Sequence, residues 1–150
     1  MAVRTVLVTF MEHQRSFDLK QIADSCGIPL QEYLISCFYC NRWLTTHEKL
    51  LYQHAELLVV WKDDLPFACC HHCILVGARV DFLTGFSRSV PVSRFGEVCS
   101  YDWNSVTIRC IRCLRKLNPL EKGDIVTNNN TIFVIKGGFR ALCCLCKVGI

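Results

Sequence analysis

The spacing of cysteines carries the clearest chemistry in this sequence. Four CxxC pairs occur, each half of the chain has the pattern CxxC-x29-CxxC, and each cysteine of the first set recurs 73 positions later. A CxxC turn places two thiolates side by side, and a second such turn completes a tetrahedral sulfur shell of the structural four-cysteine kind. The eight predicted ligands are Cys37, Cys40, Cys70, Cys73, Cys110, Cys113, Cys143 and Cys146.

The stretch ACCHHC at residues 68–73 holds more metal-binding side chains than one zinc ion needs, and the repeat selects among them. Cys70 and Cys73 recur as cysteines 73 positions later, whereas Cys69 and His72 each correspond to a leucine. The remaining thiols are expected to be small buried hydrophobic residues, and they are Cys26, Cys69, Cys99 and Cys144.

Twelve cysteines in 150 residues indicate either a disulfide scaffold or metal sites. The apolar run at residues 6–11 is too short for a signal peptide, and no stretch approaches the ~20 apolar residues that span a bilayer. We therefore expect an intracellular protein with reduced thiols, no membrane association and two zinc ions, each closed within its own half. A thioredoxin-like redox role is disfavoured, because every CxxC pair is assigned and no βαβ pattern surrounds one.

Formal charge is distributed unevenly along the chain. Residues 1–73 carry 6 Lys or Arg against 8 Asp or Glu, whereas residues 74–150 carry 11 against 5. The basic second half suits nucleic acid, an acidic protein partner, or simply a soluble surface.

Each half is predicted to contain one short helix and one β-rich run. Thr45 with Glu48, and Asn118 with Glu121, can form capping boxes that satisfy the free amides of a helix start. The runs LLVVW at 57–61 and TIFVI at 131–135 follow these helices.

The fold class is therefore α+β, with two small duplicated zinc-binding domains, each holding four cysteine ligands, joined by a connecting helix. Residues 74–85 are predicted to form that helix, which is apolar over much of its circumference and should lie between the domains. Residues 84–107 are expected to be an irregular linker, and the spacing from Leu19 to Cys26 predicts a short amphipathic helix. We place an N-terminal extension at 1–29, the first zinc domain at 30–73, the connecting helix and linker at 74–105, and the second zinc domain at 106–150.

The full pattern CxxC-x29-CxxC-x36-CxxC-x29-CxxC resembles that of the papillomavirus early protein six oncoproteins. The resemblance covers residues 30–146 and includes the motifs SCFYC, LVVWKDD and IRCIRC. It implies a small protein of the host nucleus and cytoplasm, without enzymatic activity. Its two zinc domains and connecting helix would form a cleft that captures acidic LxxLL helices of host proteins.

The same resemblance implies which residues take part in peptide binding. Tyr39, Leu57, Val60 and Ile74 would line the groove, and Arg109 would clamp the polar side of the peptide. An amphipathic helix needs such an apolar groove with basic groups at its rim. Leu57, Val60 and Ile74 are equally compatible with an ordinary core role.

The sequence also departs from the family pattern. Gly138 stands where many members carry a second clamping arginine, leaving Arg140 or Lys136 as substitutes. The chain ends KVGI, so no PDZ partner is expected, and the segment 1–29 is longer than expected. These departures favour a cutaneous or animal-virus member, which would bind a Mastermind-like coactivator of Notch signalling more readily than it would use a ubiquitin ligase.

Two other function classes compete with this interpretation. A zinc-dependent nucleic-acid-binding or transcription regulatory protein would use the basic cluster around the third CxxC pair, although no recognition finger with paired histidines is present. An enzyme is disfavoured, because no Ser, His and Asp constellation or phosphate loop occurs.

Overall fold

The computed structural model describes residues 15–149, which divide into two compact units: unit 1, up to Cys73, and unit 2, from Ile74 onward. The apolar run at residues 6–11, the first part of the predicted extension and the last residue of the KVGI end lie outside the described residues. Within the described part of the chain, no helix combines the length and apolar character needed to cross a membrane.

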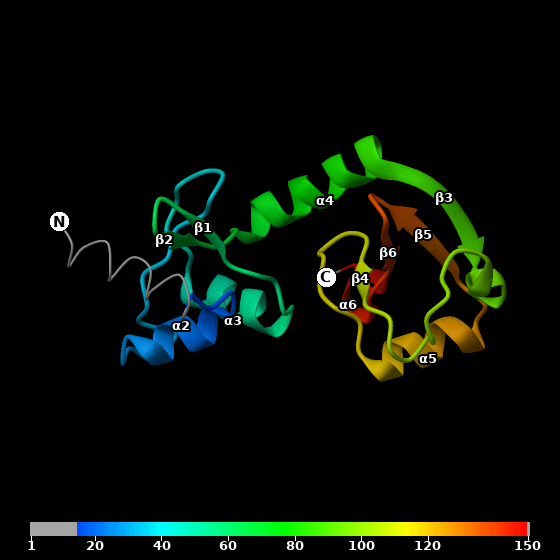
Figure 1. Ribbon diagram of the computed structural model, residues 1–150, viewed down its shortest axis with the longest axis horizontal. Helices are drawn as coiled ribbons and strands as arrows, with labels where there is room; N and C mark the ends of the chain where they lie inside the picture. Colours follow the sequence, from blue (N-terminus) through cyan, green and yellow to red (C-terminus); the bar gives the residue numbers. More distant parts are fainter. Residues whose placement is uncertain (1–14, 150) are drawn as a thin grey trace. The chain divides into compact units, whose positions relative to one another are not determined.

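The described residues of unit 1 contain two helices and a two-stranded hairpin (Figure 1). The elements are α2 (Leu19–Ser25), α3 (Thr46–His54), β1 (Val60–Lys62) and β2 (Leu65–Phe67). The start of α2 is fastened to the end of α3, because Gln53 accepts from the Lys20 amide at 3.0 Å and donates to the Asp18 carboxylate. The short helix predicted from the spacing of Leu19 to Cys26 is therefore present, with Leu19, Ile22 and Ala23 buried.

Unit 2 contains a four-stranded sheet in the order β3-β5-β6-β4. The pairs β3–β5 and β5–β6 are antiparallel, and β4 lies parallel to β6. Its elements are α4 (His71–Gly85, which starts three residues before the unit), β3 (Phe86–Pro91), the 3-10 helix η1 (Val92–Glu97), β4 (Ile108–Cys110), α5 (Pro119–Thr127), β5 (Thr131–Ile135), β6 (Gly138–Ala141) and α6 (Cys144–Lys147).

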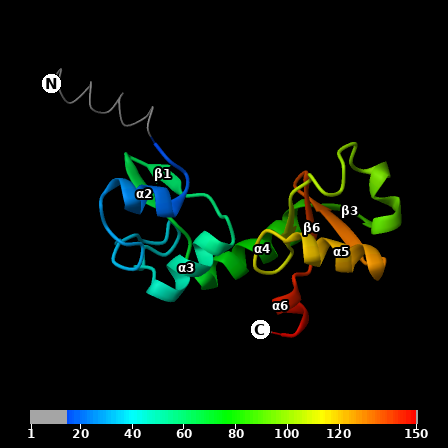
Figure 2. The same cartoon turned by 90° about the horizontal axis from the view of Figure 1, so that it is seen from below.

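The two faces of this sheet have different neighbours. Ile108 and Ile132 belong to one cluster of buried side chains with Ile125 of α5 and Phe95 of η1 in the core of the unit, whose α5, β3 and β6 are labelled in Figure 2. Side chains alternate along a strand, so Phe133 emerges on the opposite face. There its ring meets Phe82 of α4, with 6.4 Å between ring centroids.

Both predicted helix starts are confirmed as capping boxes. The Thr45 hydroxyl accepts from the Glu48 amide at 3.2 Å, while the Glu48 carboxylate accepts from the Thr45 amide at 3.0 Å. Asn118 and Glu121 make the same reciprocal pair at 2.8 and 3.0 Å. The β-rich run at 131–135 coincides with β5, whereas β1 begins at Val60 and not at 57, since the Leu57 amide still donates to Tyr52 at the end of α3.

The duplication extends to the backbone conformation. Seven non-glycine residues in the described part of the chain have positive φ, and six of them form pairs 73 positions apart. The seventh, Asp64, corresponds to Gly137, which also has positive φ. Two of these positions turn each hairpin, β1–β2 and β5–β6, in the left-handed conformation that two-residue type I′ turns require. The six paired residues are Asn41 and Leu114, Glu56 and Asn129, and Asp63 and Lys136.

The stretch 84–107, expected to be irregular, instead contains β3 and η1. Unit 1 has a counterpart of the β3 pairing at the same 73-position offset. The Val59 amide donates to the Phe17 carbonyl at 2.9 Å, matching the pairing of Val90 with Ile132 in unit 2. The repeated unit therefore starts well before the first CxxC pair. β3 escaped prediction because four of its six residues are exposed, so its sequence has no apolar alternation.

Candidate zinc centres

The eight predicted cysteines gather into two groups of four. Within each group the sulfur atoms all lie within 4.8 Å of one another. The Cys40 and Cys70 sulfurs are 3.8 Å apart, as are those of Cys113 and Cys143. Zinc bound tetrahedrally at about 2.3 Å requires sulfur atoms separated by about 3.8 Å. The donor set and its spacing therefore fit two zinc ions per chain, one for each group.

Each first CxxC turn is shaped by a left-handed residue directly after its second cysteine. In unit 2 the Leu114 amide donates to the Cys110 carbonyl at 3.0 Å, and the Cys110 amide donates to the Arg115 carbonyl at 2.8 Å. Asn41 and Arg42 repeat these contacts around Cys37. The turn folds back on itself, which directs both thiols of the pair to one side.

A backbone bridge then brings the second CxxC turn to the first. The Ile111 amide donates to the Ala141 carbonyl at 2.9 Å, and Cys110 pairs with Ala141 in the parallel register of β4 and β6. In unit 1, Phe38 and Ala68 make the equivalent 2.9 Å bond. Alanine thus recurs at positions 68 and 141, where two backbones approach closely, two residues before the third ligand of each group.

The capping glutamate of each unit connects the helix start to the second CxxC turn. In unit 1 the Glu48 carboxylate accepts from the Arg42 guanidinium at 2.7 Å and from the His71 amide at 2.8 Å. Burial alone would raise the pKa of Glu48, but these bonds and the Thr45 amide outweigh it and lower the pKa to about 2. The carboxylate therefore stays charged at neutral pH and fixes the residue that follows ligand Cys70.

Unit 2 repeats this arrangement in a more buried form. Glu121 is ion-paired with Arg115 and accepts from the Cys144 amide at 2.8 Å. Burial acts to raise the pKa of Glu121, yet the Arg115 bond and the backbone amides lower it to about 2. The Nε atom of Arg115 is buried without a hydrogen-bond partner among the described residues. Such a cation beside Cys143 suits a zinc-bound tetrathiolate group, whose net charge is negative.

Hydrogen bonds also favour the thiolate form of the buried ligand Cys110. The Cys113 thiol and the backbone amides of Cys113, Cys143 and Arg112 lower the pKa of Cys110 to about 4, against an opposing effect of burial. Metal binding requires deprotonated cysteines, so this environment prepares the site for a cation.

A family model described as Early Protein (E6) matches residues 37–146. The chain belongs to the E6 family. Protein E6 of Human papillomavirus type 1 is 31% identical over 130 residues, which cover 87% of this chain and 93% of the relative. Protein E6 of Human papillomavirus 15 is 30% identical over 138 residues, covering 91% and 98% respectively. The family resemblance inferred from cysteine spacing is confirmed, and with it the α+β fold with two groups of four cysteines.

Two buried lysines support the segments that lead into the E6 zinc groups, and sequence analysis assigned them no role. The Lys122 ammonium donates to the Trp103 carbonyl at 3.0 Å and also to the Val106 carbonyl. Lys49 donates in the same way to the carbonyls of residues 31 and 33, at 2.6 and 2.9 Å. Lysine occurs at both positions, which are 73 residues apart in the sequence, and this recurrence is the signal that could have identified them.

The four remaining thiols are not the buried residues that we expected. Cys26 and Cys144 are exposed, and Cys69 and Cys99 are partly exposed. Cys26 caps the end of α2. Cys144 directly follows the ligand Cys143, and its sulfur lies 3.9 Å from the Arg115 guanidinium.

The residues assigned to a peptide groove by the E6 resemblance are distributed over both units. In unit 1, Tyr39 and Val60 are exposed and Leu57 is half-buried. In unit 2, Ile74 is buried and Arg109 is half-buried, with its guanidinium donating to the Leu114 carbonyl at 2.9 Å. Their role in peptide binding stays a prediction.

Proposed function

We propose that this E6 protein is a non-enzymatic viral adaptor of the host nucleus and cytoplasm. It captures acidic LxxLL helices of host proteins and redirects either a Mastermind-like coactivator or a ubiquitin ligase. The observation that carries this proposal is an exposed apolar surface beside the first zinc group.

This surface is continuous within unit 1. The Phe38 ring contacts Tyr39 at 5.2 Å and Phe67 at 5.9 Å between centroids, and Phe67 pairs with Val60 across the β1–β2 hairpin. Directly opposed residues of an antiparallel pair lie on one face, so Val60 and Phe67 share it. The surface thus extends from the first CxxC turn to the hairpin through Tyr39, Phe38, Phe67 and Val60.

A basic residue adjoins this apolar surface. The Lys62 ammonium lies 5.7 Å from the centre of the Phe38 ring. An amphipathic helix buries one apolar stripe in such a surface, and carboxylates beside the stripe gain from a cation at the edge. An acidic LxxLL helix has both features, because its leucines fall on one side and acidic residues flank them.

Fluorescence anisotropy with a labelled acidic LxxLL peptide tests the proposal. Tyr39→Ala removes an aromatic ring that is 72% exposed, so folding should be little affected. We expect affinity to fall about tenfold, as for an aromatic anchor of an interface. Tyr101→Ala is the matched control, because Tyr101 is 75% exposed on unit 2 and does not belong to this surface.

The peptide supplies the second half of this design. Replacing its three leucines with alanine should abolish binding to the wild-type protein. Equal affinity of the Tyr39→Ala and Tyr101→Ala variants, or undiminished binding of the alanine peptide, would exclude this surface as the site. Arg109→Ala tests the predicted clamp, and unchanged affinity would remove Arg109 from the site.

The alternative function, nucleic-acid binding, is favoured by the exposed residues Arg112 and Lys116 around the third CxxC turn. Affinity that depends on phosphate contacts falls steeply with salt. Tight binding of a DNA duplex with a steep salt dependence, together with no measurable peptide binding, would favour this alternative over the adaptor.

A further inference from the structure

The strand β3 lies at one edge of the sheet in unit 2, on the opposite side of β5 from β6 (Figure 1). The far edge of the sheet, at β4, is covered by the stretch that follows the third CxxC turn. There the Cys110 amide donates to the Arg115 carbonyl at 2.8 Å, and the Leu117 amide donates to the Ile108 carbonyl at 2.9 Å. Among the described residues, no strand covers the outer side of β3, which is therefore an open edge.

The register with β5 determines which backbone groups of β3 point outward. The Val92 amide donates to the Asn130 carbonyl at 3.0 Å, directly after the last paired residues of the two strands. In an antiparallel pair, hydrogen bonds to one neighbour recur at every second residue. Val90 and Arg88 therefore direct their backbone groups toward β5. Ser89 presents both its N–H and its C=O to the open side.

Two features limit this open stretch. A shift of register between Phe86 and Arg88 interrupts the pairing of β3 with β5 near its start. Pro91 faces outward at the other end and offers only a carbonyl, because proline has no N–H. Unpaired backbone groups at an exposed strand edge can pair with another extended chain. Such a chain would therefore pair with residues 88–91.

Arg88 gives this open edge a positive charge. Its side chain is half exposed, and its guanidinium lies 3.9 Å from the Glu97 carboxylate. Arg94 is closer to the same carboxylate, at 2.9 Å. Two arginines thus share one acidic residue, and a net positive charge remains beside the open backbone of β3.

The side chain of Arg88 is well placed to meet a residue of an added strand. Because its backbone groups point toward β5, the residue directly opposite Arg88 on an added strand would form a non-hydrogen-bonded pair with it. Side chains lie closest in pairs of this kind, and opposite charges across two strands attract. An Asp or Glu at that position would therefore contact the guanidinium.

We propose that the open edge of β3 binds an extended acidic segment of a partner protein as an added strand. The segment exchanges backbone hydrogen bonds with Ser89 and places a carboxylate opposite Arg88. This interaction uses unit 2 and an extended chain, so it is independent of the capture of LxxLL helices by the apolar surface of unit 1.

Charge favours an acidic partner over a second copy of this chain. Residues 74–150 carry 11 Lys or Arg against 5 Asp or Glu, so two copies of unit 2 repel each other. Charged side chains on an edge strand also oppose its pairing with an identical edge. A pairing confined to residues 88–91 buries much less than the roughly 1,000 Å² of a stable interface, so its backbone bonds need the added attraction of opposite charges.

The role of charge is tested by NMR titration of the zinc-loaded, full-length protein with two acetylated peptides, Thr-Val-Glu-Val-Thr and Thr-Val-Lys-Val-Thr. The Glu peptide should shift the amide signals of residues 88–91, and the Lys peptide should bind about fivefold more weakly, because like charges across strands repel. Arg88→Glu should reverse this preference. Arg112→Glu is the charge-matched control, because Arg112 is exposed on the third CxxC turn and should leave the preference unchanged.

The role of the backbone is tested at Ser89. Ser89→Pro removes the outward N–H and keeps the bonds of its two neighbours to β5, so it should abolish binding of the Glu peptide. Ser89→Ala keeps the N–H and should bind the peptide as the wild type does. Native mass spectrometry should find two zinc ions in both variants, which separates loss of binding from loss of folding. A Glu peptide methylated at the backbone nitrogens of both valines should not bind the wild type, because its donors to β3 are lost.

Three results would overturn the proposal. One is failure of the Glu peptide to bind the wild type, and another is equal binding by Ser89→Pro and Ser89→Ala. The third is a wild-type dimer that Ser89→Pro abolishes and that the Glu peptide does not disrupt, because the occupant of the edge would then be a second copy. The LxxLL peptide should bind Ser89→Pro as tightly as the wild type, so failure at β3 leaves the adaptor function standing.

Discussion

The carboxylate of Glu121 accepts a hydrogen bond from the backbone amide of Cys144 at 2.8 Å. Glu121 belongs to the first turn of α5, and Cys144 directly follows the zinc ligand Cys143. Glu48 holds the His71 amide in the same way in unit 1. Each carboxylate therefore connects three parts of its unit: the start of a helix, an arginine that follows the first CxxC turn, and the backbone of the second CxxC turn.

Glu121→Gln should destabilise the protein by about 3 kcal/mol, because the variant leaves the buried Arg115 guanidinium without its counter-charge. Chemical denaturation in the presence of zinc measures this loss. Glu48→Gln is the matched variant in unit 1 and should cost less, since the Arg42 side chain is 49% exposed against 10% for Arg115. Equal losses in the two variants would contradict the assigned difference in burial.

The contribution of Glu121 should also depend on pH. Its pKa in the folded protein is about 2, because the Arg115 bond and amide bonds outweigh burial, whereas an unfolded glutamate titrates near about 4.3. Since the folded pKa is depressed, the stabilisation is complete above about 4.3 and is lost as pH falls toward 2. Chemical denaturation at pH 7, 5, 4 and 3 should show that the difference in free energy of unfolding between wild type and Glu121→Gln becomes smaller as pH falls. A difference that grows on acidification would contradict the depressed pKa of Glu121.

Lys122→Met should leave the Trp103 and Val106 carbonyls without their donor and cost about 2 kcal/mol of stability. Burial lowers the pKa of Lys122, but the ammonium remains the donor that these carbonyls need. Hydrogen exchange should show faster local opening around residues 103–106. Lys147→Met, which removes only a surface pair with Asp124, should leave both measurements nearly unchanged.

The sequence predicted those parts of the fold that local chemistry determines. The cysteine spacing identified both metal groups, and capping signals at Thr45 and Asn118 identified the starts of α3 and α5. Some residues other than cysteine also recur at the 73-position offset, and the structure shows what two such pairs do. Arg42 and Arg115 pair with the capping glutamates, and the lysines after those glutamates bind backbone carbonyls.

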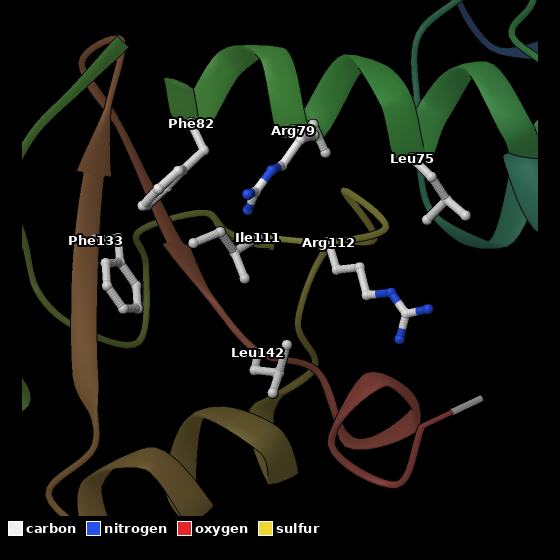
Figure 3. A pocket seen from close by; sticks show the side chains of 8 residues that line it. Leu75, Arg79, Phe82, Ile111, Arg112, Phe133 and Leu142 are labelled. Carbon is white, nitrogen blue, oxygen red and sulfur yellow. The ribbon is translucent and has the colours of Figure 1, made fainter. Parts of the chain in front are cut away.

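What the sequence did not reveal depends on partners far away in the chain. β3 is a strand because β5 pairs with it, although only Val90 and Pro91 among its residues are not exposed. In unit 1 the segment at Phe17 pairs with Val59 in the same way. So short a pairing leaves little pattern of apolar residues to detect in the sequence. Unit 2 also has a cavity lined by Arg79, Arg112 and apolar side chains (Figure 3), which the sequence did not reveal because its walls come from four segments that only the fold brings together.

The two zinc groups should load independently, because all four ligands of each lie within one compact unit. Cys37→Ser removes a ligand from unit 1, and Cys110→Ser removes the corresponding ligand from unit 2. Metal binding is part of the folding free energy of such small units, so each variant should lose order in its own unit and retain one zinc ion. Native mass spectrometry counts the ions, and hydrogen exchange locates the disordered unit. Cys26→Ser, at an exposed cysteine outside both groups, should retain two zinc ions. Loss of both ions from either ligand variant would show that the groups depend on each other.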